Sequence, residues 1–158
     1  MPNRPDPVQP ADAGAIRLAQ DLMQAARSAA LAWRDPLDRV PGISRIAFGM
    51  VSGAPMTLIS ALAPHFAALH AAPDCAVMLG EVAEKGDPLA HPRLMLRARA
   101  EFVADRRSCR AEWLKGHPKA ALYVDFADFA FVRLTPVSAL LNAGFARAFR
   151  LTPEDLVA

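Results

Sequence analysis

Arginine is the residue type through which this sequence could most readily do chemistry. It supplies 15 of the 18 basic residues, and Arg93, Arg97 and Arg99 occupy odd-numbered positions of one segment. Because alternate residues of a β-strand share a face, these guanidinium groups would line one side of a strand. A guanidinium presents a planar fork of N–H donors that matches a phosphate or a carboxylate. The same arginines could instead lie on a solvated exterior face or in a subunit contact. The sequence is compatible with this structural role and with anion binding.

The four histidines do not predict a metal site. His65 and His70 are five residues apart, so on a helix they would point about 140° away from each other. No HExxH, paired CxxC or EF-hand pattern is present, and no metal is expected. Ser60, His65 and Asp74 could be drawn as a catalytic triad, but no G-x-S-x-G turn accompanies them. No residue is therefore assigned a catalytic role.

Aromatic residues concentrate in the segment 123–131. Packing in the hydrophobic core is the first interpretation of such a cluster. A wall against a flat cofactor ring is the second, because aromatic side chains stack well on ring systems.

These groups would be carried by a mainly β chain of the β+α class. Asp12 can cap a helix reaching about residue 27, and further helices are predicted at 64–72 and 106–115. Strand-like segments occupy 29–34, 43–51, 56–62, 75–82, 93–103, 129–134 and 138–141. Several neighbouring strands have hairpin-length connections. That order favours an antiparallel barrel with a few flanking helices over a doubly wound sheet.

Length and composition limit the class of protein. The 158 residues fit a flexible Pro-rich tail at 1–11 and one domain at 12–158. A net charge of +2 argues against a nucleic-acid partner. The absence of a signal peptide and of an 18-residue apolar run predicts no secretion and no membrane span. Cys75 and Cys109 are too few for a disulfide framework, which indicates free thiols in a reducing cytoplasm.

A set of short segments, in a fixed order along the chain, resembles a known family. The segments are ISRIAF at 43–48, LISALAPH at 58–65, APDCAVML at 72–79, GDPLAHPRL at 86–94, HPKAALYVDF at 117–126, FVRL at 131–134 and AGFARA at 143–148. Together they resemble the pyridoxamine 5′-phosphate oxidase-related, FMN-binding split-barrel family, and within it the haem-utilisation (HugZ-like) branch. The resemblance extends over about residues 12–149.

The resemblance implies a split β-barrel that forms a homodimer, with FMN at the interface between the two subunits. It implies that Arg45 anchors the flavin phosphate and that Ser60 and His65 donate hydrogen bonds near it. The full cofactor-binding set that it implies is Arg45, Ile46, Ala47, Ser60, His65 and Arg93. The main chain at 46 and 47 would lie along the ring, and the arginine at 93 would make a weaker contact.

Four positions depart from the branch that the sequence resembles. Phe66, Ala68, Ala76 and Met95 stand where hydrogen-bonding side chains are usual, and each lost bond to a charged group costs about 1.5–3 kcal/mol. Two hypotheses follow. The first is an FMN-binding flavoprotein of oxidoreductase type with an unknown substrate. The alternative is a dimer that binds no cofactor or a different one, such as haem, and acts as a binding module.

Overall fold

Strands dominate the computed structural model, which describes residues 6–157. The strands are β1 (Val8–Pro10), β2 (Ser28–Arg34), β3 (Pro41–Ala47), β4 (Gly49–Val51), β5 (Ala54–Ser60), β6 (Asp74–Leu79), β7 (Arg93–Phe102), β8 (Phe129–Asn142) and β9 (Ala148–Leu151). The α-helices are α1 (Ala13–Ala25), α2 (Pro64–Ala71) and α3 (Arg106–Gly116). Short 3₁₀ turns are η1 (Pro88–Ala90), η2 (Pro118–Leu122) and η3 (Glu154–Leu156).

One continuous sheet holds all nine of these strands. Its main order is β1-β9-β8-β7-β6-β2-β3, and β5 pairs with both β8 and β4. The long strand β8 joins the two parts, because its first half pairs with β5 and its second half with β9. The sheet curls without closing, since β3 is hydrogen-bonded to β2 and to no second strand of the described chain. This is the predicted split barrel.

The sheet is not wholly antiparallel, which corrects the sequence-based prediction. β1 pairs with β9 in parallel, from Val8 opposite Ala148 to Pro10 opposite Arg150. Neither strand was predicted, and β1 falls in the segment expected to be a flexible tail. β9 offers an unpaired edge to that segment, and an ion pair between Asp6 and Arg150 (3.4 Å) lies beside it. Strands of three and four residues carry too little alternation to be recognised in a sequence.

The strand predicted at 43–51 is broken at Phe48 into β3 and β4. Phe48 is fully buried, and its carbonyl oxygen lies 2.9 Å from Nε2 of His117. Gly49 allows the close approach that follows, because a Cβ at this position would lie 3.2 Å from His117 Nε2 and 3.3 Å from the Trp113 ring. The break therefore directs β4 onto the C-terminal end of α3.

The two strands predicted at 129–134 and 138–141 are a single strand, β8. Pro136 lies within it, opposite Ala98, where the register between β7 and β8 shifts. A β-bulge leaves one residue outside the ladder, so the missing N–H of a proline is tolerated there. The bulge explains how a proline stays inside a continuous strand.

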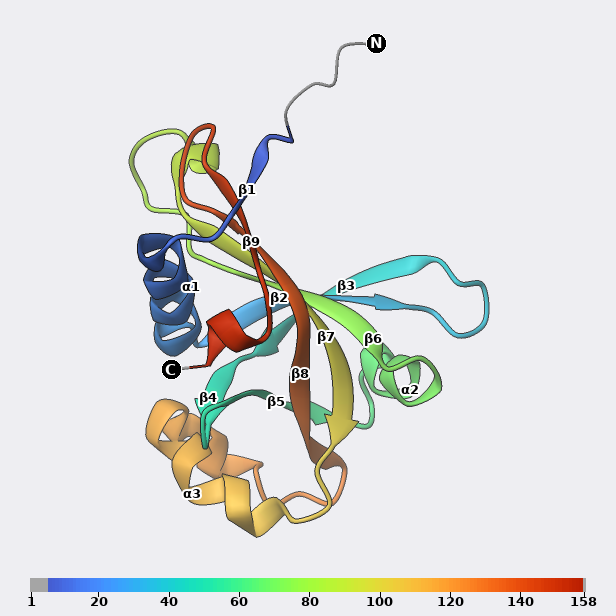
Figure 1. Cartoon of the computed structure of the whole chain (residues 1–158). Coiled ribbons are helices and arrows are strands. Elements are labelled where there is room, and N and C mark those ends of the chain that lie inside the picture. Colours follow the sequence, from blue (N-terminus) through green and yellow to red (C-terminus); the bar gives the residue numbers. More distant parts are fainter. Residues whose placement is uncertain (1–5, 158) are drawn as a thin grey trace.

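Two hydrophobic clusters hold the sheet and helices together. The larger one fills the curled sheet and is closed at one side by Ala15, Ala19 and Met23 of α1. The smaller one packs α3 against β5 and β8, with Trp113 and Phe131 fully buried. In Figure 1, α1 and α3 lie on one side of the sheet, α2 lies near β6, and the β2–β3 hairpin projects away from the body.

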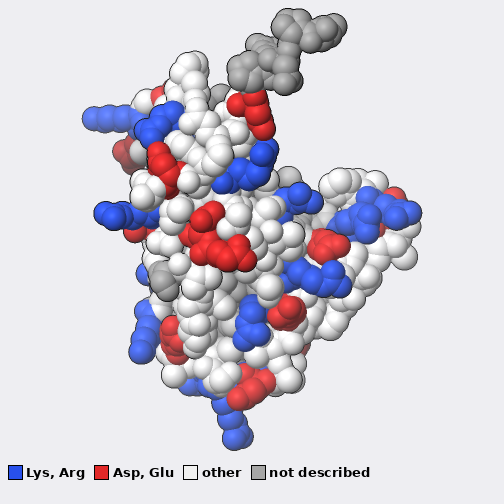
Figure 2. All heavy atoms as spheres, viewed as in Figure 1, with Lys and Arg blue, Asp and Glu red and all other residues white. Residues whose placement is uncertain are grey.

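The described surface is mixed in charge where it can be seen. On the face shown in Figure 2, basic and acidic side chains are interspersed rather than gathered by sign. Between residues 6 and 157, no helix is both long and apolar enough to cross a membrane.

Candidate functional site

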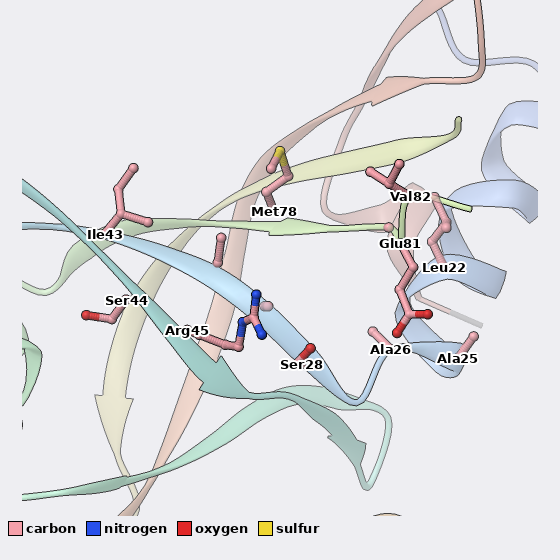
Figure 3. Close-up of a pocket in the computed structure, with 13 residues that line it drawn as sticks. Leu22, Ala25, Ala26, Ser28, Ile43, Ser44, Arg45, Met78, Glu81 and Val82 are labelled. Carbon is pink, nitrogen blue, oxygen red and sulfur yellow. The ribbon is translucent and has the colours of Figure 1, made fainter. Parts of the chain in front are cut away.

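An open cleft of about 880 Å³ lies on the outer face of the sheet, where β2, β3 and β6 approach the end of α1 (Figure 3). Its lining combines small residues, apolar residues and one charge of each sign. The small residues are Ala25, Ala26, Ser28, Ala29, Ala30, Ser44 and Gly80, the apolar ones are Leu22, Ile43, Met78 and Val82, and the charged ones are Arg45 and Glu81.

Strand register creates this cleft. Arg45 lies opposite Ala30, and Ala30 lies opposite Met78, so the three form one row across β3, β2 and β6. Alternation puts the Arg45 side chain on the outer face of β3, because Ile46 beside it is buried in the main core. A methyl group at position 30 leaves open space between the two larger side chains.

Arg45 is the one predicted site residue that lines the cleft. Its side chain is exposed, and it makes no hydrogen bond or ion pair with another residue between 6 and 157. A guanidinium group without an internal partner can bind an external anion without first breaking a contact. The small residues beside it would let a flat molecule lie close to the backbone.

His65 is held on the other side of β3. Its Nδ1 lies 3.0 Å from the hydroxyl of Ser44, and that hydroxyl accepts a hydrogen bond of 2.9 Å from Nε1 of Trp33. Figure 3 shows the Ser44 side chain pointing away from Arg45. His65 is only 8% exposed, and burial lowers its pKa. A neutral imidazole that accepts from the Ser44 hydroxyl satisfies all three groups.

The other predicted residues are also outside the cleft lining. The Ser60 hydroxyl donates to Asp128 (2.9 Å), and Arg93 donates to the carbonyl oxygen of Leu89 (3.0 Å). Ile46 is buried in the main core, and Ala47 packs against the smaller cluster. Because the resemblance puts the cofactor between two subunits, the roles of these four residues and of His65 stay predictions.

The three residues that could be drawn as a triad have separate partners. Ser60 is bonded to Asp128, His65 to Ser44, and Asp74 forms an ion pair with Arg99 at 3.3 Å. The described residues therefore hold no such triad. They also bring together no cluster of three or more side chains that could ligate a metal.

The aromatic segment belongs mostly to the core. Phe131 is fully buried, and its ring meets that of Trp113 edge to face, with 5.7 Å between centroids. Tyr123 packs against Phe129, with centroids 4.9 Å apart. None of these rings lines the cleft, so the core-packing interpretation is confirmed for them.

Apart from Arg45, sequence reasoning predicted none of the residues that line the cleft, and the missed ones include Ser28, Met78 and Glu81. Ser28 comes from β2, whereas Met78 and Glu81 come from β6 and the connection after it, and only the pairing of β2 with β6 brings these two segments together. The predicted strand 75–82 included Met78, but nothing in the sequence showed which strand would lie beside it. A pairing of distant strands leaves no local signal.

Comparisons with known proteins agree with the fold. No family model matches the sequence. The chloroplastic non-canonical heme oxygenase HOZ of Arabidopsis thaliana is 35% identical over 99 residues, which cover 61% of this chain and 30% of that protein. A solved structure that carries no description is 40% identical, with a TM-score of 0.89, and the match covers 95% of this chain and 99% of the other.

A heme-binding protein from Mycobacterium smegmatis is 25% identical with a TM-score of 0.82, over 94% of this chain and 61% of its own. A protein from Clostridium acetobutylicum related to general stress protein 26, of the pyridoxinephosphate oxidase family, has a TM-score of 0.71 at 13% identity and shows the same fold over 92% of this chain and 99% of its own. The chain therefore has the split-barrel fold of pyridoxamine 5′-phosphate oxidase-related proteins. Its similarity in sequence is to the heme-related plant and mycobacterial proteins.

The relatives and fold neighbours differ in what their names say they bind. One fold neighbour, at 14% identity and a TM-score of 0.64 over 79% of this chain and 91% of its own, is a FAD-binding protein from Mesorhizobium loti. The chain spans 30% of the length of the plant heme oxygenase and 61% of the mycobacterial protein. The comparisons therefore establish the fold, and the ligand has to be argued from the cleft.

Proposed function

We propose that this protein is an FMN-binding flavoprotein of oxidoreductase type, with the flavin bound in the Arg45 cleft. The observation that carries the proposal is an unpaired guanidinium beside a row of small residues. Such a planar fork matches the geometry of a phosphate group. Because the side chains of Ala25, Ala26 and Ala30 are only methyl groups, a flat ring can lie close against them.

The residues of the cleft fit FMN in kind. Arg45 would hold the phosphate, Ser28 offers a hydroxyl for a ribityl oxygen, and Ile43 and Met78 offer apolar surface for the ring. FMN supplies redox chemistry when bound, and the protein supplies anchoring and orientation. Two of the four lost donors, Phe66 and Ala68, belong to α2 and pack inward, so they leave the cleft unchanged.

A homodimer is part of the same proposal. The cleft is open on its outer side, and an apolar row of Met78, Met95 and Leu140 continues from it across β6, β7 and β8. Met78 is 50% exposed in the single chain. A second copy that covers this row would bury it and close the cleft, which is the arrangement that the resemblance implies.

Haem is the second candidate ligand, favoured by the names of the plant and mycobacterial relatives. Arg45 could pair with a propionate as it would with a phosphate. The lining of the cleft includes no histidine, and Met78 offers it a thioether as a possible iron ligand. Haem in this cleft would therefore use a thioether or a ligand from a second copy.

The free thiols of Cys75 and Cys109 support the cytoplasm as the compartment.

Titration of the purified protein with FMN, followed by absorbance and by retention through gel filtration, tests the proposal. Replacing Arg45→Ala removes hydrogen bonds to a charged group, so FMN affinity should fall about tenfold or more. Arg107→Ala is the matched control, because this exposed arginine of α3 lies outside the cleft. Unchanged affinity after Arg45→Ala would contradict the assignment. A retained Soret band with haemin, and no retained flavin, would establish the second candidate.

A further inference from the structure

The Arg45 cleft has a second charged residue, which the sequence did not point to. Glu81 is the one carboxylate among the residues that line it. Its side chain is exposed and has no hydrogen-bond or ion-pair partner in the described part of the chain. Arg45 and Glu81 therefore line the same cleft without forming an ion pair with each other.

The backbone fixes where Glu81 stands. Gly80 before it has a φ of +115°, and a Cβ there would lie 2.5 Å from the carbonyl oxygen of Pro92. The chain can make this turn only with glycine. The turn carries Glu81 past the end of β6 to the side of the cleft formed by α1.

The two charges stand at different ends of the cleft. Arg45 and Met78 lie in one row two strands apart, which places their Cα atoms roughly 10 Å from each other. Glu81 follows Met78 by three residues. In Figure 3 the Arg45 side chain points from β3 toward β2, and the Glu81 side chain points toward the end of α1. A ligand that spans the cleft would meet a cation at one end and an anion at the other.

We propose that Glu81 determines the ligand specificity of the cleft by accepting a hydrogen bond from an N–H donor at the end of the ligand remote from its anionic group. The proposal rests on the proposed function and deepens it. In FMN the phosphate lies at one end, and the pyrimidine edge of the ring, with its N3–H, lies at the other. FMN therefore matches both charges of the cleft.

The same pair of charges disfavours other molecules. A ligand that is anionic at both ends would bring one of its charges to Glu81, where like charges repel. Haem carries its two propionates on one edge and apolar groups on the opposite edge, so its far edge offers no donor to a carboxylate. Glu81 would then lose solvation without gaining a hydrogen bond.

Riboflavin distinguishes the contribution of Glu81 from that of Arg45, because it keeps the ring of FMN and lacks the phosphate. The experiment titrates wild-type protein, Glu81→Ala and Arg45→Ala with FMN and with riboflavin. Glu81→Ala should weaken both ligands by the same factor, about three- to tenfold, since the ring is common to both. Arg45→Ala should weaken FMN alone. Glu84→Ala is the matched control, because this exposed glutamate of the same loop does not line the cleft.

Each other outcome overturns the assignment of Glu81. Equal affinities in wild type and Glu81→Ala would show that the carboxylate makes no contact. Tighter FMN with unchanged riboflavin would show that it only repels the phosphate. Wild-type protein that binds neither flavin would overturn the proposed function together with this inference, whereas a failure confined to Glu81→Ala leaves FMN binding in place. Haemin binding that weakens in Glu81→Ala would contradict the discrimination against haem.

Discussion

The chemistry of the cleft depends on which of two neighbouring side chains of β3 points outward. The Arg45 side chain lies in the cleft, whereas the side chain of Ser44, which also borders the cleft, points away from Arg45 and is bonded to His65 and Trp33. A shift of the β2–β3 register by one residue would exchange these two faces. Gly42 limits such a shift, because a Cβ at this position would lie 2.4 Å from the Trp33 ring. The indole is thus fixed on the backbone of β3, and Arg45 is fixed with it.

Two histidines, the buried His65 and the partly buried His117, make the stability of the fold depend on pH. Burial lowers the pKa of both His65 and His117 from the ordinary value of 6.5, and Arg27 lowers that of His117 further, although a hydrogen bond to the Phe48 carbonyl opposes the shift. The unfolded chain therefore binds protons more readily than the folded one near pH 6.5. Stability is fully present above that pH and is lost as the pH falls through the lowered folded values.

We expect the free energy of unfolding, measured with urea, to fall between about pH 7.5 and pH 5.5. His65→Asn and His117→Gln together keep a polar partner at each position and remove the titration, so the double variant should lose less stability over the same interval. The carboxyl groups of Asp6, Asp125 and Glu154 have lowered pKa values and titrate below this window. If the free energy of unfolding changed equally with pH in the wild type and the double variant, groups other than these two histidines would cause the pH dependence.

At the scale of elements, the connection between β6 and β7 determines the side of the cleft opposite Arg45. Gly80 and Gly86 both have positive φ, at +115° and +92°, in this connection. They differ in the space available, because a Cβ on Gly80 would meet the Pro92 carbonyl oxygen at 2.5 Å, whereas one on Gly86 has nothing nearer than 3.9 Å. The two positions therefore separate backbone strain from steric overlap.

Gly86→Ala should cost about 1 kcal/mol of unfolding free energy, since it adds only the strain of a positive φ. Gly80→Ala should cost clearly more, about 2 kcal/mol or above, because overlap with a backbone atom is added to the strain. Urea denaturation of the two variants measures the difference. Equal losses would mean that the chain near Pro92 moves aside freely, and the position of Glu81 would then not be fixed by this turn.

The sequence predicts elements well where alternation or capping is long enough to be seen. The helix capped by Asp12 and the alternating strand from Arg93 occur as expected, with Asp12 accepting a hydrogen bond from the N–H of Ala15. Prediction fails where a tertiary contact decides. The break at Phe48 depends on His117 and Trp113, far along the chain, and the continuity of β8 through Pro136 depends on a bulge against β7.

In the candidate site too, some residues could be predicted from the sequence and others depend on tertiary contacts. Arg45 was identified through the resemblance and lines the cleft, whereas Glu81 and Ser28 could not be identified, because the pairing of β2 with β6 is not visible in either segment alone. Local physics determines what each segment forms. Only the assembled sheet determines which segments become neighbours.

For the whole molecule, the outer face of the sheet is the surface that a second copy would cover. Met78, Met95 and Leu140 form an apolar row across three strands, and no helix separates Met78 from solvent. A carboxylate in such a row would be desolvated on dimerisation without a partner, and an unpaired buried charge costs several kcal/mol. A single substitution should therefore weaken the dimer without disturbing the core on the other face.

Met95→Glu is the variant that tests this face, because Met95 points outward, between the buried Leu94 and Leu96, and lies outside the cleft lining. Light scattering after gel filtration should give wild-type protein about twice the chain mass of 17.0 kDa and the variant close to one chain mass. Leu122→Glu, on an exposed residue of η2, is the control and should stay dimeric. The variant should also lose FMN if the partner closes the cleft. A monomeric wild-type protein that still binds FMN tightly would show that one copy completes the site alone, and the open cleft would then need no second subunit.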